Sequence, residues 1–160
     1  PEPLVGRLES VFKNSDGDLR ALAAALIDAD EAWSNQPVKM RSPYEFLMAG
    51  VRAVARGVPQ SPGRLLGALR VMGMPLWQPP GPNGWPDTVA AWATPKGVKS
   101  RLDVAAAFAA RLKEEVQPTQ LLDAVIGEAA SRETRQAIAR AESRQQGLAL
   151  VLMSPEFQWR

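Results

Sequence analysis

The chain has 160 residues, of which 46% are hydrophobic and 22% charged, as in an ordinary globular domain. The formal charge is +2, and each half of the chain has one more basic than acidic residue, so no basic arm favours a nucleic-acid partner. Cysteine and histidine are both absent, which excludes disulfides, thiol nucleophiles, histidine-based triads and zinc sites with Cys or His ligands from these residues.

The first 33 residues predict two helices joined by a turn. Apolar side chains recur at helical spacing over residues 3–12 and again over residues 18–29. The sequence Asn-Ser-Asp-Gly at residues 14–17 is typical of a turn, and side chains in and beside it can cap the second helix. The candidate capping residues are Ser15, Asp16 and Asp18.

An acidic cluster follows the second helix, before Trp33. It consists of Asp28, Asp30 and Glu31. Such a cluster can hold a hard cation, but this one lacks the alternating oxygen ligands, central glycine and distant glutamate of an EF-hand loop. We interpret it as a solvated helix end, and the sequence predicts no metal site.

The clearest helix start is Ser42-Pro43-Tyr44-Glu45, which combines a serine N-cap, proline at the first helical position and glutamate at the third. The cap is worth about 1 kcal/mol, and the helix that it opens is expected to end near Gly57. Ser61-Pro62 predicts a second start of the same kind, for a helix that closes at Gly73.

Residues 72–97 contain six prolines, four glycines and three of the five tryptophans. Proline removes a backbone donor and fixes φ, so this stretch cannot form a long regular helix or an inner strand. Three indoles exposed together would leave large apolar surfaces in water. We therefore predict a long ordered connection whose indoles fold inward and brace it against a helical body.

The last 60 residues return to helical patterns. Ser100 is expected to cap a helix over residues 101–115, and Pro118 to open one that ends around Gly127. Ser131 begins a last helical region that Pro155 stops. No alternating β pattern of useful length occurs. The sequence predicts an all-α fold, an irregular bundle of six to eight short helices, forming a single domain over residues 1–160.

The tryptophan-rich segment is also the one candidate binding site. Indoles stack well on sugar rings and on proline-rich peptides, and one carboxylate in this segment has a setting that resembles a cleft. The candidate ligand-binding residues are Trp77, Trp85, Asp87 and Trp92. In the competing interpretation the indoles are a brace and Asp87 caps the short segment 88–92. The glycines match no phosphate-binding motif, and no catalytic residue or cofactor is predicted.

Four arginines recur near the end of the chain, in a stripe that glutamates interrupt. They are Arg132, Arg135, Arg140 and Arg144. We interpret them as a solvated helix face, stabilised by an i,i+4 pair between Glu128 and Arg132. Ser154 precedes Pro155 as a helix-ending residue and has no histidine or lysine beside it, so it needs no catalytic role.

Several phrases of the sequence resemble the C-terminal part of the DUF1800 proteins, bacterial proteins of unknown function that are several hundred residues long. They are Ser42-Pro43-Tyr44-Glu45-Phe46 with Arg52, Gly73-Met74-Pro75-Leu76-Trp77-Gln78-Pro79-Pro80, Gly84-Trp85-Pro86 with Trp92, and Ser154-Pro155-Glu156-Phe157-Gln158. The resemblance runs from about residue 38 to the end. It implies a C-terminal fragment of a longer protein, carries over no catalytic residues, and is compatible with an extracytoplasmic location.

Together these observations favour an interaction or scaffold module. It would pack, through apolar surface, against a missing N-terminal part of its own chain or against a protein partner. The alternative is a ligand- or carbohydrate-binding, or hydrolytic, module that uses a tryptophan-lined cleft around residues 72–97. No apolar run approaches the roughly 18 residues of a membrane span, and the sequence does not decide whether the protein is an enzyme.

Overall fold

The computed structural model describes residues 2–33, 39–54 and 61–160. They form ten α-helices and two short 3₁₀ turns but no β-strand, which confirms the predicted all-α fold. Eight of the ten helices have at least eight residues, and the other two are single turns of four. The chain divides into two compact units, Pro1–Pro37 and Val38–Arg160, and each is described by itself. The single domain over residues 1–160 stays a prediction.

Unit 1 is a helical hairpin. It contains α1 (Glu2–Asn14), α2 (Leu19–Ile27) and the 3₁₀ turn η1 (Asp30–Ala32). Of the three candidate caps, Asp18 is the one that caps α2, since its Oδ1 accepts from the backbone N–H of Arg20 at 2.8 Å and of Ala21 at 3.3 Å. Only Leu4 and Ala29 of the described hydrophobic residues in this unit are buried. The hairpin therefore has almost no core of its own.

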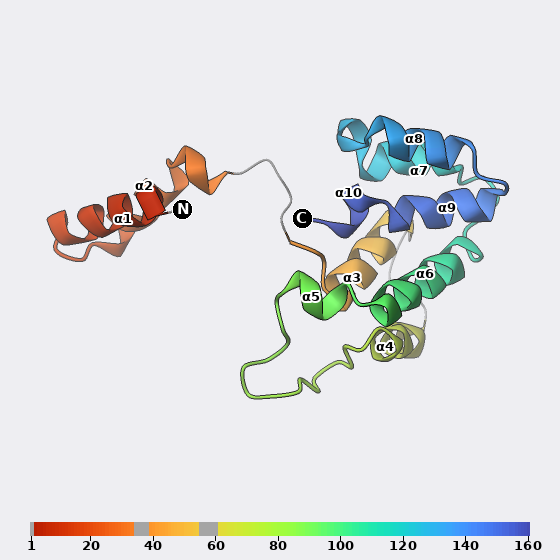
Figure 1. Cartoon of the computed structure of the whole chain (residues 1–160), viewed down its shortest axis with the longest axis horizontal. Coiled ribbons are helices and arrows are strands. Elements are labelled where there is room, and N and C mark those ends of the chain that lie inside the picture. The colour runs from red at the N-terminus through yellow and green to blue at the C-terminus, as the bar shows by residue number, and fades with distance from the viewer. Residues whose placement is uncertain (1, 34–38, 55–60) are drawn as a thin grey trace. The chain divides into compact units, whose positions relative to one another are not determined.

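Unit 2 holds the remaining eight helices (Figure 1). They are α3 (Pro43–Val54), α4 (Pro62–Val71), α5 (Val89–Trp92), α6 (Pro95–Ala109), α7 (Pro118–Val125), α8 (Arg132–Ala139), α9 (Arg144–Met153) and α10 (Pro155–Gln158), with the 3₁₀ turn η2 (Gly127–Ala129) between α7 and α8.

Helix α9 is the centre of unit 2. It contacts α6, α7, α8 and α10, while α3 contacts α4, α6 and α7 (Figure 1). In α9, the side chains of Leu148, Val151 and Leu152 have no exposed surface, because this helix is apolar on nearly every side. Gly147 lets the first turn of α7 approach, since a Cβ there would lie 2.8 Å from Cγ of Pro118.

Both predicted boundaries of α6 are wrong, and its end lies at Ala109 rather than near residue 115. Helix α6 begins at Pro95 rather than after Ser100, because Thr94 accepts from the N–H of Gly97 at 3.1 Å and Pro95 fits the first helical position. The last helical region is three helices, α8, α9 and α10. Ser143 starts α9 by accepting from the N–H of Gln146 at 3.1 Å, so the chain stops and restarts there without a proline or glycine.

The capping box at the start of α3 is confirmed. The N–H of Ser42 donates to Oε2 of Glu45 at 2.8 Å, and the N–H of Glu45 donates to Oγ of Ser42 at 3.3 Å. The predicted end of this helix, Gly57, lies outside the described residues. Ser61 precedes α4 as predicted, but its side chain makes no capping hydrogen bond.

The two ends of unit 2 pair with each other. Met40 and Trp159 form an isolated antiparallel bridge, in which the N–H of Arg41 donates to the carbonyl of Gln158 at 2.8 Å. Lys39 and Arg160 exchange both backbone hydrogen bonds, at 3.1 and 2.9 Å. The chain therefore enters and leaves this unit at one place.

Candidate functional site

The three indoles of the proline-rich connection have different environments. Trp92 is buried, and its Nε1 donates to the carbonyl of Pro86 at 2.9 Å. Trp85 is half-buried, with its ring 6.2 Å from that of Trp92. Trp77, in contrast, is 88% exposed. The brace interpretation therefore describes Trp85 and Trp92 but not Trp77.

The backbone of Trp77 has φ +61°, a left-handed conformation that is uncommon for residues other than glycine. The indole lines an apolar groove of about 360 Å³. The lining residues of this groove are Tyr44, Leu69, Met74, Leu76, Trp77, Pro79, Gly84 and Trp85. None of them has a charged or amide side chain, which a site for sugars would need to fix its ligand.

The four candidate ligand-binding residues do not gather at one spot. Trp77 and Trp85 share the groove, but Asp87 and Trp92 do not line it. Asp87 is exposed and forms an ion pair with Lys39. Asp87 does not cap α5 either, since Thr88 is the N-cap residue and no side chain bonds the free N–H groups there. Their joint role in ligand binding stays a prediction.

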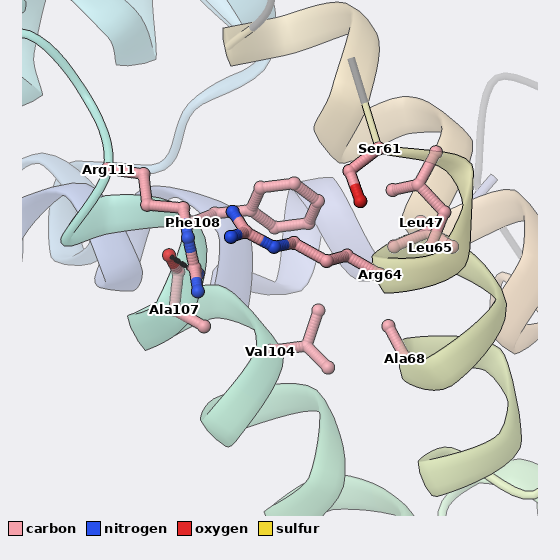
Figure 2. A pocket seen from close by; sticks show the side chains of 9 residues that line it. All are labelled: Leu47, Ser61, Arg64, Leu65, Ala68, Val104, Ala107, Phe108 and Arg111. Carbon is pink, nitrogen blue, oxygen red and sulfur yellow. Dashed lines mark hydrogen bonds between the residues drawn. The ribbon is translucent and has the colours of Figure 1, made fainter. Parts of the chain in front are cut away.

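A cavity of about 450 Å³ lies between α3, α4 and α6 (Figure 2). Its walls are apolar. They are formed by Leu47 of α3, Leu65 and Ala68 of α4, and Val104, Ala107 and Phe108 of α6. Gly50 lets the Phe108 ring lie close against α3, because a Cβ at position 50 would be 3.3 Å from Cε2 of that ring. No motif or spacing in the sequence predicted this cavity.

Three polar residues complete the lining: Ser61, Arg64 and Arg111. Figure 2 shows the guanidinium groups of Arg64 and Arg111 pointing to the same region beside Phe108. Nη1 of Arg111 donates to the carbonyl of Ala107 at 2.6 Å. No described lining residue is acidic. Two positive charges beside an apolar cavity favour an anionic group at this place.

Arg101 is a further arginine in an unusual position, because it is buried: only 1% of its surface is exposed. Its Nη1 donates to Oε1 of Gln158 at 3.0 Å and its Nη2 to the carbonyl of Arg41 at 2.6 Å. The guanidinium also lies 5.2 Å from the centre of the Phe46 ring. Burial lowers the pKa of Arg101 to about 10, so it is still charged at neutral pH. It connects helices and faces no described carboxylate at hydrogen-bonding distance.

The partly buried carboxylates join elements and are not poised as acids or bases. Burial raises the pKa of Glu156, but hydrogen bonds from the N–H of Ser131 (2.8 Å) and Oγ1 of Thr134 (2.9 Å) outweigh it and hold the pKa below its ordinary value. The pKa of Glu45 is likewise lowered: hydrogen bonds from Ser42 and the ion pair with Arg160, at 2.7 Å, overcome its burial. A general base at neutral pH needs the opposite shift.

The acidic cluster Asp28, Asp30 and Glu31 does not form a cation site. In the acidic cluster, Glu31 pairs with Arg7 at 2.6 Å on the surface. No group of three or more Asp, Glu, Cys or His side chains in the described residues could hold a metal ion. No helix among them has the length and apolar character of a membrane span.

The arginine stripe is not a single solvated face. Arg135 pairs with Asp123 at 2.7 Å and donates to the carbonyl of Gly127 at 2.6 Å. Arg144 donates to carbonyls at the end of the segment after α6, among them that of Val116 at 2.9 Å. The predicted i,i+4 ion pair between Glu128 and Arg132 is not present among the described residues, since Glu128 lies in the 3₁₀ turn η2 and Arg132 begins α8, so the two are not on one helix.

Comparison with known protein families finds a match over nearly the whole chain. The family model described as "Protein of unknown function (DUF1800)" matches residues 1–159. The match therefore extends over the first 37 residues as well, which the resemblance in the sequence phrases did not include. No curated protein and no solved structure matches the chain.

Proposed function

The chain belongs to the DUF1800 family, and from that premise we propose that it serves as a protein-interaction module. The apolar face around Trp77 is its contact surface, and the occupant is an extended segment of a partner protein. The observation that carries the proposal is the 88% exposure of the Trp77 indole, beside a half-buried Trp85 and a buried Trp92 in the same connection.

Further apolar side chains are exposed around Trp77. They are Leu66 of α4 and Leu76 of the connection, which line a groove together with Trp77. The larger groove and a second one of about 160 Å³ share Leu76 and Trp77, so these two side chains form a ridge between two grooves. Exposed apolar patches mark interaction surfaces, and tryptophan is enriched among the residues that dominate binding energy.

The charge of the face indicates the chemistry of the partner. Arg70 lines the smaller groove and is the one charged side chain among the described lining residues of both. A partner segment with a proline or aliphatic side chain in the larger groove and a carboxylate near Arg70 would be complementary. The carbohydrate or hydrolase alternative finds no support here, because no carboxylate or amide side chain lines either groove except Gln78, at the edge of the smaller one.

Photocrosslinking followed by a binding measurement tests this proposal. A photoreactive amino acid at position 77, in cells that make the protein naturally, is expected to crosslink one predominant protein, and the same group at exposed Gln136 of α8 is not. The purified partner should then bind the chain with a Kd that Trp77→Ala weakens by about tenfold or more. Trp33→Ala, which removes another exposed indole, is the matched control. Equal crosslinking at both positions, or a Kd that Trp77→Ala leaves unchanged, would overturn the proposal.

A further inference from the structure

We propose that the cavity between α3, α4 and α6 binds a small amphipathic carboxylate. The aliphatic tail of the ligand lies against the apolar walls, and its carboxylate lies between the guanidinium groups of Arg64 and Arg111. This site shares no lining residue with the grooves around Trp77 and does not depend on the proposed interaction function.

The apolar walls of the cavity favour a ligand with an aliphatic tail. Leu47 has no exposed surface, and Leu65, Ala68, Val104 and Phe108 are only half-buried because one side of each faces the cavity. A ligand tail would remove this apolar surface from water, which is the main source of affinity in such sites. The volume of about 450 Å³ lies within the roughly 300–1,000 Å³ typical of pockets for small molecules.

The polar side of the cavity selects the head group. Arg111 lies in the turn that follows α6, and its Nη1 donates to the carbonyl of Ala107 in that helix. Its other N–H groups make no side-chain hydrogen bond within the described residues. Arg64 makes no side-chain hydrogen bond or ion pair within the described residues and points to the same region (Figure 2). Two planar guanidinium groups match the two oxygens of a carboxylate, and the absence of an acidic lining residue disfavours a cationic ligand.

Titration of the whole chain with four probes separates the contributions of tail and charge. Decanoate, kept below its micelle concentration, is expected to bind. Decanol has the same tail without the charge, and its affinity should be at least about tenfold lower than that of decanoate. Decyltrimethylammonium has the same tail with a positive charge and should not bind measurably. Acetate has the negative charge without the tail and should not bind measurably either. Equal binding of decanoate and decanol, or binding of the cation, would overturn the proposal.

Variants locate the site. Arg64→Gln with Arg111→Gln should weaken decanoate binding by about tenfold or more, while Arg132→Gln with Arg140→Gln removes the same charge from exposed positions of the C-terminal region and should have little effect. Ala68→Phe fills the cavity and should abolish binding, whereas Ala106→Phe, on an exposed position of α6, should not. Circular dichroism confirms that each variant is folded. Decanoate binding that is unchanged in the variant without Arg64 and Arg111, or a loss of binding as large in a control variant as in the matching cavity variant, contradicts the assignment.

Discussion

Arg101 shows how one buried side chain can join distant parts of unit 2. Its guanidinium reaches Gln158 of α10 and the backbone of Arg41, and it lies over the ring of Phe46 of α3. Its hydrogen-bonding partners are neutral oxygens, so burial of the charge is offset by hydrogen bonds and by the ring rather than by an ion pair. A lysine would not reproduce this, because it lacks the planar fork that binds two acceptors at once.

Replacing this residue should destabilise unit 2. Arg101→Met keeps an apolar stem but leaves the two acceptor oxygens without a donor, and each such group costs roughly 1–3 kcal/mol. We expect the free energy of unfolding, measured in urea, to fall by roughly 2–4 kcal/mol. Arg52→Met is the control, since Arg52 is exposed on α3 and its loss should change stability by less than about 0.5 kcal/mol. Equal effects of the two substitutions would contradict this role for Arg101.

At the scale of elements, three helices of unit 2 begin with Ser-Pro. The serine caps the helix at α3 (Ser42) and at α10 (Ser154), but Ser61 does not cap α4. Ser42 is followed three residues later by Glu45, whose carboxylate accepts from the N–H of Ser42 and closes the capping box. The corresponding residue after Ser61 is Arg64, which has no acceptor to offer. The Ser61 hydroxyl accepts from no backbone N–H at the start of α4 and lines the cavity instead.

This difference predicts unequal effects of the same substitution. Ser42→Ala should lower the free energy of unfolding by about 1 kcal/mol, the usual value of a serine N-cap. Ser61→Ala should lower it by less than about 0.5 kcal/mol, because no capping hydrogen bond is lost. Chemical unfolding of both variants beside the original chain checks this. A larger loss for Ser61→Ala than for Ser42→Ala would contradict it.

The sequence predicted helices best where spacing and a local start signal agree, as in α3 and α7. It missed the start of α6 because Thr94-Pro95 lies inside the proline-rich stretch, where a helix was not expected. That error also made Arg101 the first residue of the predicted helix, whereas it lies in the interior of a longer helix and is buried. The cavity depends on side chains as far apart as Leu47 and Arg111, and helical periodicity alone does not specify such packing.

For the whole molecule, the two units differ in how much apolar surface they bury. Unit 2 has a continuous core of 15 buried residues drawn from nearly all of its helices. Unit 1 buries Leu4 and Ala29, while Val5, Leu19 and Ile27 are more than half exposed. Two helices of 13 and nine residues are too short to be stable without a packed face. Unit 1 therefore needs another surface for its stability.

Separate preparation of the two units tests this conclusion. A peptide of residues 1–37 should show little helix by circular dichroism, whereas residues 38–160 should unfold cooperatively in urea. The single domain predicted from the sequence would appear as a higher urea midpoint for the full chain than for residues 38–160. A peptide that unfolds cooperatively on its own would refute the need for a covering surface.

The pairing of Lys39 with Arg160 and of Met40 with Trp159 also has a mechanical consequence. Tension applied between the two ends of unit 2 would act across neighbouring antiparallel backbones, so their hydrogen bonds would be loaded one after another, as in a zipper. The ion pair of Arg160 with Glu45 of α3 and the hydrogen bonds of Arg101 to Arg41 and Gln158 would carry part of the same load. A pull on the two ends of unit 2 would therefore act first on this paired segment and on the side chains that anchor it.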